Sequence, residues 1–144
     1  MKPLPHLYNV RLAGGPNDYA LVSTDGVPDL RAAPPADFDG PGDVWSPEHL
    51  MLAAVETCLL FTLRSVAKAS KFEFVSLEVS GDGTVGRKDG ATKFTEIVLH
   101  ARLKVPHGGN KERAVRVLEK SEKACLVSAS LSTPVRVEAE IEFA

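Results

Sequence analysis

The sequence SPEHLMLAAVETCLLFTL, residues 46–63, has the features of the start and body of a long helix. Ser46 predicts an N-cap, because its hydroxyl can accept a hydrogen bond from a free N–H of the first turn. Pro47 suits the first helical position, and Glu48 puts a negative charge where the helix dipole favours it. We expect this helix to continue to about Ala69.

The predicted helix is apolar on almost every side. Between Leu50 and Leu63 few residues interrupt the apolar run, namely Glu56, Thr57, Cys58 and Thr62. A surface helix has a single apolar stripe, so a helix of this kind must be covered on most of its sides. One sheet of a 144-residue chain can cover one flank. We expect a second subunit to cover the other flank, so the sequence predicts a homodimer.

Composition limits the classes of function. The chain is long enough for a single domain over residues 1–144, and its 44% hydrophobic and 25% charged residues are typical of a soluble protein. A net charge of −2 does not favour nucleic acid or an anionic membrane as a partner. We expect no run of the roughly 20 apolar residues that a bilayer span requires, and no apolar signal peptide. The sequence therefore predicts a cytoplasmic protein whose two cysteines are free thiols or a redox pair.

The region before the helix predicts short strands and one long loop. The strands are expected at residues 6–13, 19–24 and 28–31, and the loop at residues 32–45. A loop of this length without regular structure is usually functional or disordered. Phe38 and Trp45 favour a loop that packs against another surface.

The region after the helix predicts a hairpin, a second helix and a final strand. Strands are expected at residues 72–80, with a bulge near Val75, at 95–105 and at 135–143, and a helix capped by Asn110. The sequence GDGTVG, residues 81–86, matches G-x-G-x-x-G, but no helix follows it, so we interpret it as part of a hairpin. The resulting order ββ(β)–α–ββ–α–β predicts an α+β fold with largely antiparallel sheets and helices on one face.

Two cysteines are candidates for chemistry. Cys58 shares a helical stripe with Val55 and Thr62, and Cys125 is in phase with the apolar stripe of the second helix. A buried structural thiol is the more common role of such a cysteine. Two inward-facing thiols can also meet in a small α+β fold. Such a pair can cycle through a sulfenic acid and a disulfide.

Glu48 cannot act on Cys58 within one helix, because ten residues at 1.5 Å each separate them by roughly 15 Å. It could share a site with Cys58 only from another copy of the helix at a subunit interface. The alternative is a carboxylate that only complements the helix dipole. The four histidines have no metal-like spacing with each other or with the cysteines; they are His6, His49, His100 and His107.

Residues 46–58, SPEHLMLAAVETC, resemble the Asn-Pro-Glu…Cys signature of the OsmC/Ohr family, the osmotically inducible protein C and organic hydroperoxide resistance proteins. Residues 125–128, CLVS, resemble the second cysteine motif of that family. The resemblance covers the chain from about residue 20 to its end. It implies an intertwined homodimer, with antiparallel sheets wrapped around two long central helices.

The resemblance also implies a thiol peroxidase for organic hydroperoxides that uses no metal, haem or other cofactor. Cys58 would be the peroxidatic thiol and Cys125 the resolving thiol. Glu48 would be the carboxylate that holds an arginine beside the reactive sulfur. A dithiol such as a lipoyl group, or a small thiol, would be the reductant.

The chain departs from the family pattern at several positions. Ser46 replaces the asparagine before the proline, and Leu126 replaces a common proline after the second cysteine. The positions expected for the assisting arginine correspond to residues 17–19 and Phe38, none of which is an arginine. Arg11 and Arg31 are the remaining substitutes. This departure favours the alternative of a non-enzymatic OsmC-like protein that binds an apolar ligand or senses oxidants.

Overall fold

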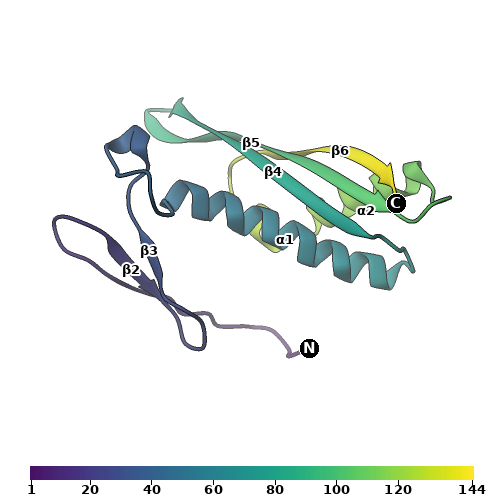
Figure 1. Ribbon diagram of the computed structural model, residues 1–144, viewed down its shortest axis with the longest axis horizontal. Coiled ribbons are helices and arrows are strands. Elements are labelled where there is room, and N and C mark those ends of the chain that lie inside the picture. Colours follow the sequence, from purple (N-terminus) through teal and green to yellow (C-terminus); the bar gives the residue numbers. More distant parts are fainter. The chain divides into compact units, whose positions relative to one another are not determined.

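A computed structural model describes all residues of the chain, 1–144, and the chain forms two compact units, Met1–Leu50 and Met51–Ala144 (Figure 1). The helix α1 (Pro47–Ala69) begins at the end of the first unit and lies mostly in the second. Its bounds confirm the predicted helix. A single domain over residues 1–144 stays a prediction.

The first unit contains a three-stranded antiparallel sheet in the order β1 (Arg11–Ala13), β2 (Ala20–Ser23) and β3 (Leu30–Ala32). The first strand is shorter than predicted because Arg11 pairs with Ser23, the last residue of β2. Residues 6–10 therefore extend past the end of their neighbour.

The loop at residues 32–45 is held by backbone contacts within its own unit. The N–H of Ala33 donates to the carbonyl of Trp45 at 3.0 Å, and a 3₁₀ turn, η1, spans Ala36–Phe38. Gly40 is required there, because a Cβ at this position would lie 1.6 Å from a backbone oxygen of Pro34. The side chains of Phe38 and Trp45 are 55% and 49% exposed, so the surface against which this loop was predicted to pack is not within the single chain.

The second unit contains the sheet β4 (Ser76–Lys88), β5 (Ala91–Val105) and β6 (Val135–Phe143). The strands β4 and β5 form the predicted hairpin, and Asp89 and Gly90 turn it with φ of 51° and 77°. The sequence GDGTVG lies inside β4, so it is not a nucleotide loop. The irregularity in this strand falls between Thr84 and Val85 and not near Val75, where it was predicted.

The strands β5 and β6 pair in parallel, from Ile97 opposite Val135 to Val105 opposite Phe143. The chain between them crosses through α2 (Lys111–Lys123) and α3 (Leu126–Ala129). A crossover of this kind returns the next strand in the same direction, so the pairing is parallel. The predicted α+β fold is confirmed, and this one pairing is the exception among otherwise antiparallel strands.

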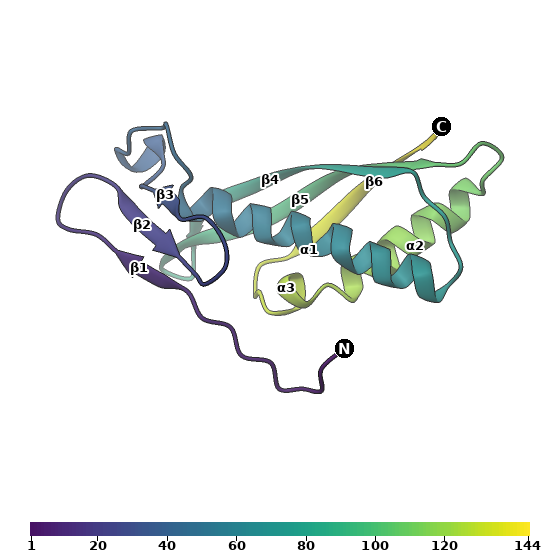
Figure 2. The ribbon, with the colours of Figure 1, turned by 60° about the horizontal axis from the view of Figure 1, so that its bottom comes forward.

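The core of the second unit lies between its sheet and its helices, which cover one face of the sheet (Figure 2). The buried residues of α1 repeat every four positions, and β5 and α2 supply the rest of the core. They are Val55, Leu59, Leu63 and Ala67 on α1, Ile97, Leu99, Ala101, Leu103 and Val105 on β5, and Ala114, Val117 and Leu118 on α2. The predicted cap of α2 is confirmed, because the Asn110 side chain accepts from the N–H of Arg113 at 2.8 Å.

The helix α1 is longer and more apolar than its buried stripe requires. By length and composition it could cross a bilayer, with a mean hydropathy of 1.7, so the expectation that no segment reaches this length is wrong. Only 22% of its most apolar window is buried in the protomer. Its stripe at Val55, Leu59 and Leu63 nevertheless belongs to the core of the second unit.

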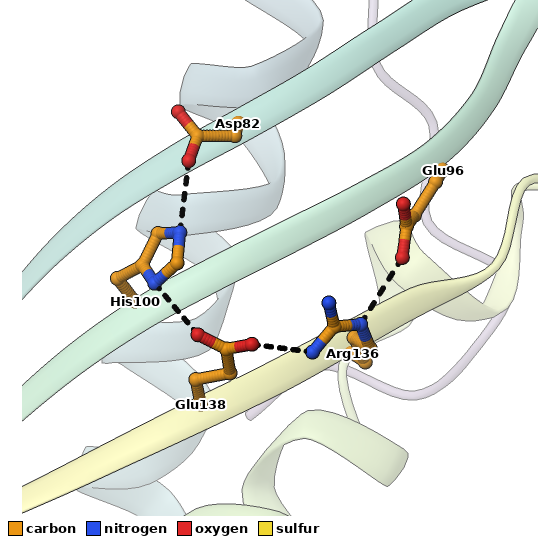
Figure 3. A network of polar contacts seen from close by, with 5 residues as sticks. All are labelled: Asp82, Glu96, His100, Arg136 and Glu138. Carbon is orange, nitrogen blue, oxygen red and sulfur yellow. Dashed lines mark hydrogen bonds and ion pairs between the residues drawn. The ribbon is translucent and has the colours of Figure 1, made fainter.

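The opposite face of the same sheet carries a chain of charged groups (Figure 3). His100 lies between two carboxylates, with Nε2 at 2.8 Å from Asp82 and Nδ1 at 3.0 Å from Glu138. Arg136 contacts Glu138 and also Glu96, at 3.1 Å. All five side chains are substantially exposed, so solvent screens their attraction and each pair adds little stability.

Candidate functional site

The start of α1 is built as predicted. The Ser46 hydroxyl oxygen accepts a hydrogen bond from the N–H of His49 at 3.1 Å and lies 2.6 Å from Nδ1 of the same residue. Ser46 is 1% exposed, so this cap is buried. Glu48 follows in the first turn, and its carboxylate has no ion-pair partner within the first unit. A role for Glu48 beyond the helix dipole stays a prediction.

Cys58 lies in the middle of α1 and its thiol is half-buried. The Sγ of Cys58 is 3.8 Å from the hydroxyl oxygen of Thr62, one turn further along the helix. Residues four apart on a helix lie on the same face, so the stripe that carries the thiol also carries this hydroxyl.

Cys125 lies in the bend between α2 and α3. It was predicted at the tail of α2, but that helix ends at Lys123, and Cys125 is the residue that precedes α3. Its N–H donates to the carbonyl of Glu122, and its carbonyl accepts from the N–H of Ala129, both at 3.0 Å. The residue is fully buried, which confirms that it faces inward.

The structure brings the two cysteines together. Burial acts to raise the pKa of the Cys58 thiol, but hydrogen bonds outweigh this effect and the pKa is lowered. The Cys125 thiol is the strongest of these donors, followed by the N–H of Val127, the Thr62 hydroxyl and the N–H of Leu126. Hydrogen bonds to the charged form of a group favour that form. The site therefore stabilises a thiolate at Cys58.

The pKa of Cys125 is shifted in the opposite direction. Burial raises the pKa of its thiol, and donation to Cys58 raises it further, while the N–H and hydroxyl of Ser128 oppose the change. Two thiols that share a proton in this way titrate as a pair. Within this pair the contacts favour the thiolate at Cys58 and the protonated thiol at Cys125.

This arrangement provides a half-buried nucleophile and a buried, proton-bearing neighbour. A thiolate, not a thiol, attacks electrophiles such as a peroxide oxygen. A second thiol in contact with the first can then condense with the oxidised product. Both cysteines are free thiols.

No arginine is among the groups that lower the pKa of Cys58. The two substitutes considered from the sequence are engaged within the first unit. Arg11 pairs with Asp25 at 2.9 Å, and the guanidinium of Arg31 lies 4.0 Å above the ring of Tyr19. No group of three or more His, Cys, Asp or Glu side chains is arranged to hold a metal ion.

Several contributors to the site were missed from the sequence. The Thr62 hydroxyl could have been found, because Thr62 follows Cys58 by four residues on a predicted helix. The N–H groups of Leu126 and Val127 could not, because they depend on how the chain bends after α2. Ser128 lies in α3, which follows that bend.

Known proteins resemble this chain in sequence and in fold. The sequence model of the OsmC-like protein family matches residues 40–140. An uncharacterized protein of Bacillus subtilis, YmaD, is 25% identical over 109 residues, which are 74% of this chain and 73% of that protein.

Solved structures share the fold over nearly the whole chain. An OsmC-like protein of unknown function from Vibrio cholerae superposes with a TM-score of 0.84 at 16% identity, covering 94% of this chain and 100% of that one. An organic hydroperoxide resistance protein from Elizabethkingia anophelis gives a TM-score of 0.77 at 24% identity, with 98% and 100% covered. A protein of the same description from Legionella pneumophila gives 0.75 at 24% identity, with 96% and 99% covered. The chain therefore belongs to the OsmC-like (OsmC/Ohr) protein family.

Proposed function

We propose that the protein is a thiol peroxidase that reduces organic hydroperoxides with Cys58 as the attacking residue and Cys125 as the resolving residue. The observation that supports this most is the contact between the two thiols, which lowers the pKa of Cys58 and raises the pKa of Cys125. One sulfur is thus prepared to attack while the other keeps its proton for the following step.

The reaction has two chemical steps. The Cys58 thiolate attacks the outer oxygen of the hydroperoxide, the O–O bond breaks, and the alkoxide takes a proton to leave as an alcohol. Cys58 is then a sulfenic acid. Cys125 loses its proton and attacks the Cys58 sulfur, the S–O bond breaks, and a disulfide and water form. Two thiols of a reductant, such as a dithiol of the lipoyl type, restore both cysteines by disulfide exchange.

The active form in this proposal is a homodimer. The support is the uncovered apolar surface of the protomer, since most of the apolar window of α1 is not buried. Phe61 on α1 is 55% exposed although it lies three residues after Cys58. A second copy would cover such a face and exclude water from the thiols. We place this dimer in the cytoplasm, where thiols stay reduced.

Glu48 takes part only in such a dimer. Its distance along α1 excludes it from the Cys58 of its own chain, so it would approach Cys58 from the partner subunit. There it would hold an arginine, for which Arg11 and Arg31 are the candidates. Exchange of their present partners, Asp25 and Tyr19, would be part of forming that site.

The test is treatment of the reduced protein with cumene hydroperoxide, followed by mass spectrometry of the intact chain and its peptides. We expect a Cys58–Cys125 disulfide in the wild type. Cys125→Ser should stop at a Cys58 sulfenic acid that dimedone traps, and Cys58→Ser should form neither product. Absence of both products in the wild type contradicts the peroxidase.

The second candidate is a non-enzymatic protein of the same family that binds an apolar ligand or senses oxidants. The absence of an arginine among the groups that act on Cys58 favours it. It predicts that the wild type consumes hydroperoxide no faster than free cysteine at the same concentration. A rate far above that of free cysteine, lost in Cys58→Ser, contradicts this candidate.

A further inference from the structure

We infer that Thr62 is a positioning residue for the Cys58 thiolate, to which its hydroxyl donates a hydrogen bond from one turn along the same helix. This inference deepens the proposed function, because a stabilised thiolate at Cys58 is what the peroxidase requires. It uses a side chain that the sequence presents as an ordinary polar interruption of an apolar run.

The hydroxyl of Thr62 behaves differently from the other hydroxyls of α1. Serine and threonine inside a helix usually donate to the carbonyl four residues earlier. Thr57 follows this rule and donates to the carbonyl of Ala53 at 2.8 Å. Ser65 does the same with Phe61 at 3.4 Å. The partner of the Thr62 hydroxyl is instead the Sγ of Cys58, at 3.8 Å.

The direction of this hydrogen bond depends on the state of the sulfur. In the thiol form either atom can be the donor. A thiolate has no proton, so the hydroxyl must donate to it, and the interaction becomes charge-assisted and stronger. The contact therefore favours the thiolate over the thiol, in agreement with the lowered pKa of Cys58.

Thr62 also differs from the other donors to Cys58 in the element to which it belongs. Cys125 lies in the bend between α2 and α3, and Leu126 and Val127 are the first two residues of α3. Cys125 must lose its proton to resolve the sulfenic acid, and it can no longer donate once it has done so. Thr62 is on the same helix as Cys58, so its geometry toward the sulfur is set by α1. Cys125 is also the titratable group that contacts Cys58, whereas Glu56 on α1 bonds to the N–H of Gly81.

The experiment measures alkylation of Cys58 by iodoacetamide from pH 5 to pH 9, with the modified peptide quantified by mass spectrometry. Thr62→Val keeps the shape of the side chain and removes the hydroxyl. We expect its alkylation midpoint to move to higher pH and its rate at pH 7 to fall about two- to tenfold, the effect of one hydrogen bond. Thr62→Ser should restore the wild-type profile to within about twofold, because it restores the donor.

Thr57→Val is the matched control, because it removes a hydroxyl from the same helix that bonds to a carbonyl and not to the sulfur. It should leave the Cys58 profile unchanged. The inference is overturned if Thr62→Val has the wild-type profile, if Thr62→Ser behaves like Thr62→Val, or if Thr57→Val shifts the profile equally. Alkylation does not depend on peroxide reduction. A wild type that consumes no cumene hydroperoxide but shows the Thr62 effect would therefore contradict the peroxidase alone.

Discussion

The two units of the chain differ in how far their apolar residues are buried. In Met1–Leu50 the buried residues are Ala32, Ala33 and Ser46, and its three strands have only three or four residues each. The large apolar side chains of its first segment are exposed, namely Leu4, Leu7, Tyr8, Val10 and Leu12. In Met51–Ala144 a continuous core joins α1, β5 and α2.

This difference shows that the second unit has a core of its own and the first does not. A sheet of short strands that buries so little apolar surface is at best marginally stable alone in water. In the proposed dimer, the exposed apolar residues of the first unit are a surface that the second subunit could cover. The peroxidase proposal depends on the same cover, because it requires a dimer.

The largest expected loss of stability comes from a substitution in the core of the second unit. Leu59→Ala removes a fully buried side chain of α1 and leaves a cavity, so it should lower the free energy of unfolding by about 2–5 kcal/mol. Leu12→Ala in the first unit removes a side chain that is 71% exposed. Urea denaturation of both variants measures whether Leu59→Ala lowers the free energy of unfolding more than Leu12→Ala does. If Leu12→Ala costs as much as Leu59→Ala, the first unit is covered in the assembled protein.

The next effect concerns two glycines. Gly83 lies where β4 has no space for a side chain, since a Cβ would be 2.5 Å from the ring of Phe94 and 3.0 Å from Leu52. Gly83→Ala should destabilise the protein by about 1–3 kcal/mol through overpacking. Gly15 in the first unit has open space around it, so Gly15→Ala should be neutral or slightly stabilising. Equal melting temperatures for the two variants would contradict the packing of the second unit.

A smaller effect depends on pH. Burial raises the pKa of Glu56, and the N–H of Gly81 only partly opposes this. A carboxyl with a raised pKa in the folded state is favourable below its unfolded pKa, and this advantage is lost as the pH rises through the folded value. Glu56→Gln should therefore raise the melting temperature at pH 7 and have little effect near pH 4. Asp25→Asn, on an exposed ion pair of the first unit, is the control. An equal gain at both pH values would show that the Glu56 charge is not responsible.

The smallest effect is expected on the charged face of the second sheet. Glu138 contacts His100 and Arg136, and Arg136 holds the pKa of Glu138 below its usual range. These groups are exposed to solvent, which screens them. Glu138→Gln should have a melting temperature close to that of the wild type in 0.15 M salt. A large drop in the melting temperature would mean that this face is shielded from solvent. Burial would then not be confined to the core side of the second sheet.

Much of the fold could be predicted because its signals are local. Ser46 and Pro47 mark the start of α1, Asn110 caps α2, and alternation of apolar and charged residues defines residues 135–143, the bounds of β6. These signals depend on neighbours within a few residues. The inward direction of Cys125 was predicted in the same way, from the phase of the apolar residues around it.

The remaining features depend on contacts between distant residues. Alternation along β6 does not show whether its neighbour runs parallel or antiparallel, and the crossover through α2 and α3 settles this. The contact of Cys58 with Cys125, and with N–H groups at residues 126 and 127, depends on the bend after Lys123. Local patterns show which residues are apolar and which way they face. Which groups meet, and therefore which thiol loses its proton first, follows from the packing of helices on a sheet.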